Sequence, residues 1–229
     1  MSKGERTRAA ILDEALDMTS TEGLTGLTIG SLADRLGMSK SGLFAHFGSK
    51  EQLQLAVLQH AADVFTDIVF RPAFKVPAGL PRIEAMFDNW IAWSKSSKLP
   101  GGCPIQGASI EFDDRPGPIR DFLAFTQENL AKAIIGAVQR AIDAGHFRAD
   151  IDKEQFAFEF VSLSYGFGLT YRLMRHTRGE EMARRAFADI IERARPVFSA
   201  AGRPLDHHSP DKDMASHGGA VVTPLRSHR

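Results

Sequence analysis

Apolar residues recur at helical spacing along most of the chain, and no segment shows the sustained apolar–polar alternation that a half-buried strand requires. No unit repeats at the period of a solenoid. Clusters of glycine, proline and serine divide this pattern into about nine helical segments. The sequence therefore predicts an all-α fold in which short turns connect the helices.

Turn and capping signals give the expected helix boundaries. The predicted helices cover residues 3–19, 29–36, 40–47, 50–70, 82–97, 105–112, 119–144, 153–176 and 180–200. A serine, threonine or aspartate precedes four of them as an N-cap: Thr28, Ser39, Ser49 and Asp152. Gly37 and Gly48 end two of the short helices, and the helix over 50–70 is expected to stop before Pro72.

Composition limits the compartment and the chemistry. The chain has 229 residues, of which 43% are hydrophobic. We expect no membrane span, because no apolar run approaches about 20 residues, and the first ten residues lead into no signal-peptide core. The single cysteine, Cys103, excludes an intramolecular disulfide and a zinc finger. These features predict a cytoplasmic protein.

The overall charge does not point to a polyanionic partner. The 28 lysines and arginines balance the 28 acidic residues, and the pI is about 7.1. The local distribution differs, because the segment from Arg35 to Lys50 carries three basic side chains and His46 but no acid. Any case for nucleic-acid binding therefore rests on this segment.

The segment from Thr28 to Phe47 meets the demands of a helix-turn-helix. Two short helices flank Gly37, which can adopt the left-handed turn conformation, and Ala33 is small where the helices would cross. Leu43 is expected to point into the core. The outer face of the second helix is then formed by Ser39, Lys40, Ser41, Gly42 and Phe44. Hydroxyls and an ammonium can bind phosphates or base edges there, and glycine permits close backbone approach.

The stretch from Leu27 to Leu53 resembles the TetR family of bacterial repressors. In that family a threonine opens the second helix, an aromatic residue and a His-Phe pair close the third, and a lysine begins the fourth. The residues at these places are Thr28, Phe44, His46, Phe47 and Lys50. The usual aromatic residue is tyrosine, whose hydroxyl touches a phosphate, so Phe44 lacks that contact. The glycine-rich loop 101–104, followed by residues 111–118, is similar to a subgroup of the family's C-terminal domains.

The resemblance implies a domain division and a mode of DNA binding. Residues 1–50 form a three-helix DNA-binding domain that continues into the fourth helix to about residue 65, and residues 51–202 form a larger helical domain for ligand binding and dimerisation. Residues 203–229, rich in His, Ser, Pro and Gly, are expected to be a disordered tail. The expected DNA-contacting residues are Thr28, Arg35, Ser39, Lys40, Ser41, Gly42, Phe44, His46 and Lys50.

The resemblance also implies the partners. A homodimer joined through the last two long helices would bind a palindromic double-stranded operator. An unknown small-molecule effector would bind between the helices of residues 82–176 and release the repressor from DNA. Its candidate contacts are Phe87, Trp90, Trp93, Cys103, Phe122, Phe125 and Tyr165. Aromatic residues at helical spacing also suit the core, so that alternative applies to each of them.

Other readings of single residues point to structure rather than chemistry. Cys103 could sense redox state, but no His or Asp stands beside it in a catalytic signature, and free cysteines are usually buried. Glu111, Asp113 and Asp114 could bind a cation, although acids beside proline and glycine usually form solvated turns. We therefore predict no catalytic residue, no metal and no cofactor.

Two rival functions remain at this point. A helical enzyme would use Cys103 or the acidic loop, but the sequence has no phosphate-binding glycine loop, zincin helix or nucleophile elbow. A helical ligand-binding module whose DNA reader has decayed would explain the neutral N-terminal region and Phe44. We predict a DNA-binding regulator and not an enzyme, and a gel shift with the chain's own upstream DNA separates the alternatives.

Overall fold

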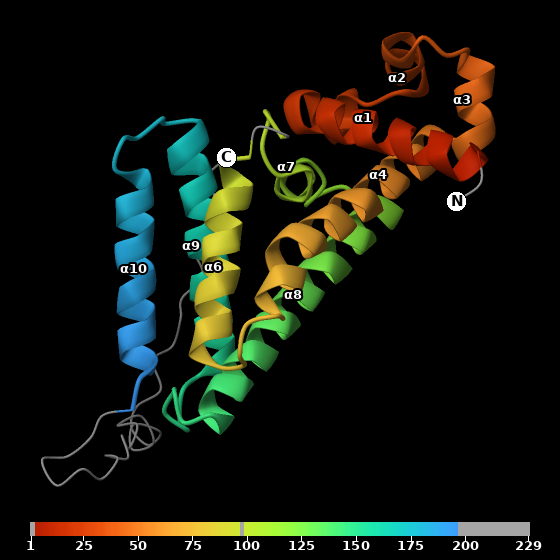
Figure 1. Cartoon of the computed structure of the whole chain (residues 1–229). Helices are drawn as coiled ribbons and strands as arrows, with labels where there is room; N and C mark the ends of the chain where they lie inside the picture. Colours follow the sequence, from red (N-terminus) through yellow and green to blue (C-terminus); the bar gives the residue numbers. More distant parts are fainter. Residues whose placement is uncertain (1–2, 97–98, 197–229) are drawn as a thin grey trace, which may run out of the picture. The chain divides into compact units, whose positions relative to one another are not determined.

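The computed structural model describes residues 3–96 and 99–196, which belong to one compact unit, Met1–Pro196. Every regular element in these residues is helical (Figure 1). The all-α prediction is therefore confirmed for the described part of the chain. The tail predicted over 203–229 lies outside the described residues.

The chain begins with a helix that is longer than predicted. Helix α1 covers Lys3–Gly26, and the expected break appears inside it as a kink at Gly23, which has φ 76° and ψ 166°. The hydroxyls of Ser20 and Thr21 bond back to the carbonyl of Asp17, one turn earlier, within the last regular turn before the kink. The sequence thus marked the place of the break, but not the turn that follows it.

Two short helices follow, with the predicted boundaries. Helix α2 covers Ile29–Leu36 and α3 covers Lys40–Phe47. Thr28 Oγ1 accepts a hydrogen bond from Ser31 N at 3.0 Å, and Ser31 Oγ accepts one from Thr28 N at 3.1 Å, which forms a reciprocal capping box. Gly37 lies in the left-handed region with φ 63°, as its place between the helices predicted.

The fourth helix continues past the proline that was expected to end it. Helix α4 (Lys50–Phe65), the π-helical turn η1 (Thr66–Phe70) and α5 (Arg71–Ala73) form one continuous rod. The Arg71 amide bonds to the carbonyl of Thr66, five residues back. This wider turn directly precedes Pro72 and accommodates its ring and its missing N–H, so the rod ends after Ala73.

The same rod bears on the expectation that the chain has no membrane span. Residues Lys50–Ala73 form 24 helical residues, and an 18-residue stretch within them has a mean hydropathy of 1.2, so the rod is long and apolar enough to cross a membrane by length and composition alone. Its residues Leu53, Val57 and Leu58 are fully buried in the protein core. A count of uninterrupted apolar residues missed the rod because Asp63 and Asp67 interrupt it. The core helix of a soluble protein passes the same composition test, so this one helix is weak evidence for a membrane span.

The remaining helices pack beside this rod and beside one another (Figure 1). They are α6 (Leu80–Ser94), α7 (Pro104–Glu111), α8 (Pro118–Asp143), α9 (Lys153–Arg172) and α10 (Gly179–Ala194). Helix α9 contacts α6, α8 and α10, whereas the short α7 contacts α1, α4 and α8. Helix α9 ends four residues before the predicted end at 176, and Arg175 just beyond it has a positive φ of 48°. Residues 97 and 197–200 of the predicted helices lie outside the described residues.

An aromatic cluster forms the centre of the core between α6, α9 and α10. The rings of Phe87 and Phe187 stack with their centroids 4.0 Å apart, and Phe160 meets both rings edge to face. Trp90 lies 6.0 Å from Phe160 on the side that faces α8 and η1. The core thus supports a cavity on that side.

Candidate nucleic-acid interface and cavity

Helix α3 presents a polar outer face and an apolar inner face. Leu43 and Phe47 are buried on the side where α3 packs beside α2 and α4, while Lys40, Ser41 and Phe44 are exposed, Phe44 to 53%. Most of the predicted outer-face residues are therefore accessible: Ser39, Lys40, Ser41 and Phe44 are exposed, and Gly42 is half-buried. Ser39 Oγ accepts from the Gly42 amide at 3.1 Å, so the N-terminal turn of α3 is fixed by its own cap.

Two predicted DNA-contacting residues are engaged in bonds within the domain. Arg35 pairs with Glu14 and with Asp17 of α1, the latter at 2.6 Å. The hydrogen bond that Arg35 Nε donates to the Glu14 carboxylate is the main cause that raises the pKa of Arg35. Thr28 is the N-cap of α2. Both residues brace the helix-turn-helix, and their contact with DNA stays a prediction.

His46 and a residue that the sequence analysis missed lie beside Phe47. The rings of His46 and Phe47 are 6.2 Å apart and tilted by 51°, so the imidazole packs beside the Phe47 ring. The guanidinium of Arg8, on α1, lies 5.1 Å from the centre of the Phe47 ring and is exposed. This places a further cation beside α3. No local pattern could reveal it, because the contact joins residues about forty positions apart.

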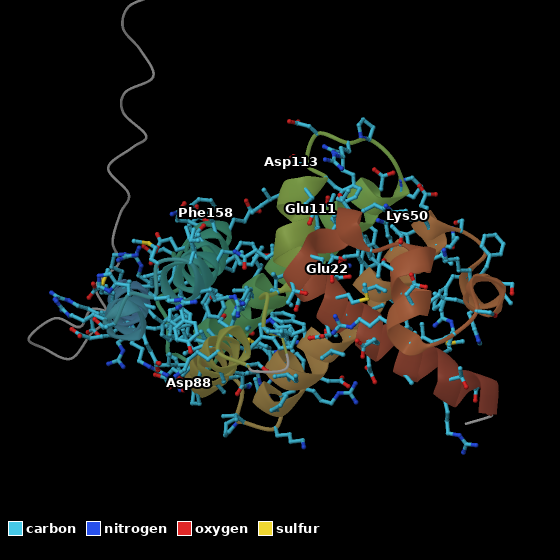
Figure 2. All side chains as sticks on the ribbon, turned by 90° about the horizontal axis from the view of Figure 1, so that it is seen from above. Glu22, Lys50, Asp88, Glu111, Asp113 and Phe158 are labelled. Atoms are coloured by element: carbon cyan, nitrogen blue, oxygen red, sulfur yellow. The ribbon has the colours of Figure 1, made fainter. Side chains whose placement is uncertain are left out.

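The turn after the Gly23 kink is held from two sides. Lys50 Nζ donates to the Thr25 carbonyl at 2.9 Å, and Gln54 Nε2 donates to the Leu24 carbonyl at 2.7 Å. On the other side, the carboxylate of Glu111 accepts from the amides of both turn residues, and Figure 2 shows Glu111 beside α1. Glu111 was expected only as part of an acidic loop, and its bonds to α1 had no sequence signal.

The acidic loop itself does not form a metal site in the residues that the structure describes. No group of three or more His, Cys, Asp or Glu side chains comes together there. Asp113 and Asp114 are exposed, whereas Glu111 is half-buried against the turn. The carboxylates therefore separate in space even though they are adjacent in sequence.

A cavity of about 340 Å³ lies between the continuous rod, α6, α8 and α9. Most of its wall is apolar or aromatic. The lining residues are Gln59, Ala62, Asp63, Phe65, Thr66, Phe70, Phe74, Trp90, Cys103, Ile105, Phe122, Phe125, Thr126, Gln127, Asn129, Leu130, Ala133 and Tyr165. The volume is near the lower end of the range for ligand pockets, which suits a small molecule.

The cavity includes five of the seven predicted ligand contacts. Trp90, Cys103, Phe122, Phe125 and Tyr165 line it. The other two are absent from the lining: Phe87 belongs to the core stack, and Trp93 is buried with its ring 5.6 Å from that of Phe65. Phe65 and Phe70 of the rod and Phe74 just beyond it also line the cavity and were not predicted, because the π turn in this region had no recognised sequence signal.

One end of the cavity carries a polar pair. Tyr165 and Gln127 are joined by hydrogen bonds of 2.7 and 2.9 Å, and Gln127 Nε2 also donates to Ser109 Oγ at 3.2 Å. Burial raises the pKa of Tyr165 and also that of the Cys103 thiol. Cys103 thus stays a neutral thiol at neutral pH, which disfavours the redox reading because the thiolate is the reactive form.

Family models match both halves of the chain. Residues 11–57 match the model described as bacterial regulatory proteins of the tetR family, and residues 79–187 match a tetracyclin repressor-like C-terminal domain. The transcriptional regulator RutR of Escherichia coli O157:H7 is 40% identical over 129 residues, which cover 52% of this chain and 61% of RutR. The match thus spans less than two thirds of that relative.

Solved structures of regulators share the fold. A TetR regulator from Chloroflexus aurantiacus superposes with a TM-score of 0.71 at 25% identity, covering 84% of this chain and 96% of that one. A regulator from Saccharomonospora viridis, solved in complex with choline, has a TM-score of 0.66 at 20% identity and covers 82% and 96%. Both family models describe transcriptional regulators rather than enzymes. The chain belongs to the TetR family of bacterial transcriptional regulators.

Proposed function

We propose that this regulator is a homodimeric repressor that binds a palindromic operator through α3 and leaves it when a small molecule enters the cavity. The observation that carries the DNA-binding part is the outer face of α3, where Lys40, Ser41 and Phe44 are exposed on a helix fixed by caps at both ends. A short, rigid helix with an accessible polar face can enter the major groove.

The proposed DNA contacts combine positioning and reading. Lysines and hydroxyls at the ends of α3 and α4 would contact phosphates, and the first turn of α3 would reach base edges. The residues proposed to face DNA are Thr28, Arg35, Ser39, Lys40, Ser41, Gly42, Phe44, His46 and Lys50. Arg8 joins them, because its exposed guanidinium stands beside α3.

An apolar stripe along α9 supports the dimer. Phe158 is 66% exposed, and Leu169 and Leu173 extend the same side of the helix at helical spacing. Gly166 lies on this side with open space around it, which permits close helix approach. Met182 of α10 is also exposed. A second copy covering these side chains by a two-fold contact is the occupant that we propose, because the family assembles through these helices.

The charge of the cavity wall favours an uncharged effector. The lining contains no lysine or arginine, so a carboxylate or phosphate ligand would enter without a countercharge. Its one acid, Asp63, is exposed and accepts a hydrogen bond from Gln59 at 3.0 Å. The Tyr165–Gln127 pair can orient a single polar group on an otherwise apolar molecule. A small aromatic molecule without charge fits these properties.

A cytoplasmic location follows from the proposed partner, because operator DNA lies in the cytoplasm of bacteria. The apolar rod Lys50–Ala73 does not oppose this, since one helix of this length and composition is weak evidence for a membrane span and its residues Leu53, Val57 and Leu58 are buried in the core.

The proposal is tested by binding to DNA from the region upstream of the chain's own gene. Fluorescence anisotropy with the full chain should give specific binding that survives excess unrelated DNA, with a footprint of two half-sites about one helical turn apart. Binding of equal strength to all sequences would leave a helical module without a functional reader. If the upstream region is not bound specifically, a pull-down of genomic fragments would show whether an operator lies elsewhere.

A further inference from the structure

The carboxylate of Glu111 binds two successive backbone amides in the turn that connects α1 to the helix-turn-helix. Its Oε1 accepts from Leu24 N at 3.0 Å, and its Oε2 accepts from Thr25 N at 2.9 Å and from Thr25 Oγ1 at 2.8 Å. Hydrogen bonds to a charged acceptor are stronger than neutral ones. Three of them join residues that are 86 or 87 positions apart in the sequence.

The turn is shaped to admit this carboxylate. Gly23 has a φ of 76°, which turns the two following amides out of the hydrogen-bonding pattern of α1. A Cβ built on Gly23 would lie 2.5 Å from Glu111 Oε1. The backbone conformation therefore favours glycine at this position, and a side chain here would displace the Glu111 carboxylate from the turn.

The carbonyl groups of the same turn are bound from the opposite side by α4. Gln54 donates to the Leu24 carbonyl and Lys50 to the Thr25 carbonyl, at 2.7 and 2.9 Å. Thr28, the N-cap of α2, follows only three residues after Thr25. The orientation of this turn therefore sets where α2, and with it α3, begins.

The other end of α7 reaches the cavity. Cys103, the N-cap of α7, and Ile105 in its first turn line the cavity wall. Ser109, on the same helix, accepts a hydrogen bond from Gln127 of the cavity's polar pair. The eight residues of α7 span about 12 Å, so one short rigid helix has the cavity at one end and Glu111 at the other.

We propose that Glu111 is a positioning residue for operator binding, which fixes the helix-turn-helix to α7 and carries displacement of α7 by a cavity ligand to the reading helix. The proposal rests on the function proposed above. In this role the Glu111 carboxylate makes no contact with DNA. Its bonds to the turn hold the two reading helices of the dimer at one spacing, which binding to two half-sites requires.

The test compares the full-length chain with three variants on the upstream duplex that the wild type binds. Glu111→Gln keeps the size of the side chain but turns an amide NH₂ toward one of the backbone donors. Thr25→Val removes the hydroxyl, which donates to Glu111 and accepts a longer hydrogen bond of 3.4 Å from Arg115 Nη1, and leaves both backbone amides bound to the carboxylate. Asp114→Asn is the matched control, because it removes an exposed carboxylate three residues away that does not contact the turn. We expect operator affinity to fall at least tenfold in Glu111→Gln, by less in Thr25→Val, and not in the control.

A second readout separates positioning from simple destabilisation. Inserting one base pair between the half-sites should weaken the wild type strongly, because its reading helices are held at a fixed spacing. Glu111→Gln should lose much less affinity on the same insertion, since its reading domains are freer to move. If Glu111 had a merely structural role, Glu111→Gln would lower the active fraction of protein. The ratio between the affinities for the original and the lengthened operator would then be the same as in the wild type.

Amide hydrogen exchange provides a test of the same contact that does not depend on DNA. Exchange at Leu24 and Thr25 should accelerate in Glu111→Gln, while exchange in α9 stays as in the wild type. Unchanged exchange at the turn, or faster exchange with unchanged operator affinity and spacing tolerance, overturns the role of Glu111 alone. A wild-type chain that binds no operator overturns the proposed function, and this inference falls with it.

Discussion

Lys50 donates a hydrogen bond from its ammonium to the carbonyl oxygen of Thr25, with 2.9 Å between Nζ and O. The side chain is exposed at the start of α4. A cation at this end of a helix opposes the helix dipole, so a partner of opposite charge would stabilise it. The Thr25 carbonyl supplies one partial negative charge, and two donor hydrogens of the ammonium remain for a phosphate.

We therefore expect Lys50→Ala to weaken binding almost equally for all operator sequences. The slope of log affinity against log salt should fall by about one unit, because one phosphate contact is lost. Lys132→Ala, which removes an exposed lysine of α8 paired with Glu128, is the control and should leave the slope unchanged. Weaker binding with an unchanged slope would show that Lys50 acts only through the Thr25 turn.

Gly42→Leu should damage operator binding far more than folding. The Gly42 position lies in the first turn of α3, and a Cβ there meets only the hydroxyl of Ser39, at 3.0 Å. Folding should therefore change by about 1 kcal/mol or less, since a glycine in a helix is itself unfavourable. The leucine side chain would occupy the space between helix and groove, so we expect an affinity loss of more than tenfold by anisotropy.

Gly107→Leu is the matched control for this substitution. Gly107 is an exposed glycine in another eight-residue helix, α7, with open space around its Cβ position. Operator affinity should remain within a factor of about two of the wild type. Normal operator binding by Gly42→Leu would show that this side of α3 does not enter DNA.

The sequence predicted the local elements well because their causes are local. The capping residues Thr28 and Ser39 and the left-handed Gly37 fixed α2 and α3 at their observed boundaries. The rod through Pro72 could not be predicted, because a π turn depends on packing rather than on a nearby residue pattern. Contacts such as Glu111 to Thr25 were equally out of reach, since they join segments through the tertiary fold.

Alkaline pH should destabilise the folded chain through two buried groups. Burial raises the pKa of Cys103 and of Tyr165 above their usual values of 9.0 and 10.0. The unfolded chain therefore loses these protons at lower pH than the folded chain. The contribution of both groups to the free energy of unfolding is fully present below pH 9.0. For each group it is lost as the pH rises from the pKa in the unfolded chain toward the higher pKa in the folded chain.

Urea titrations between pH 7 and 11 measure this effect. Cys103→Ala should flatten the loss of stability that begins near pH 9.0, and Tyr165→Phe should flatten the part above pH 10.0. Tyr171→Phe is the control, because that tyrosine is exposed. If all three variants lose stability as steeply as the wild type, neither buried group controls the alkaline limit.

Phe158→Glu should separate the proposed dimer. The side chain is 66% exposed on the apolar stripe of α9, as Figure 2 shows at the outer side of that helix, so the monomer tolerates a charge there. A two-fold contact would bring two such charges into an apolar interface. We expect light scattering to report a monomer, and operator affinity to fall by more than a hundredfold because one half-site remains.

Ile110→Glu is the control for the dimer prediction. Ile110 is 72% exposed on α7 and belongs to neither α9 nor α10, so the same change of charge should leave the dimer intact. A dimeric Phe158→Glu would place the contact between copies on another surface.

The last prediction is that a cavity ligand and the operator weaken each other's binding by the same factor. The continuous rod begins at Lys50 in the DNA-binding region and presents Phe65 and Phe70 to the cavity, while α7 connects the cavity to the Thr25 turn. A ligand that displaces either helix changes the distance between the two reading helices, which must match half-sites about 34 Å apart.

Trp90 lines the cavity with its ring 5.0 Å from Phe65, so its fluorescence should report occupancy. A matched panel of indole, indole-3-acetate and tryptamine, titrated with and without the operator duplex, tests charge and coupling together. We expect indole to bind more tightly than its anionic and cationic analogues, and to lose roughly 5- to 150-fold in affinity when operator is bound. Equal indole affinities in both states would exclude the coupling, and tighter binding of the anion would contradict the proposed ligand class, because the cavity wall offers it no basic side chain.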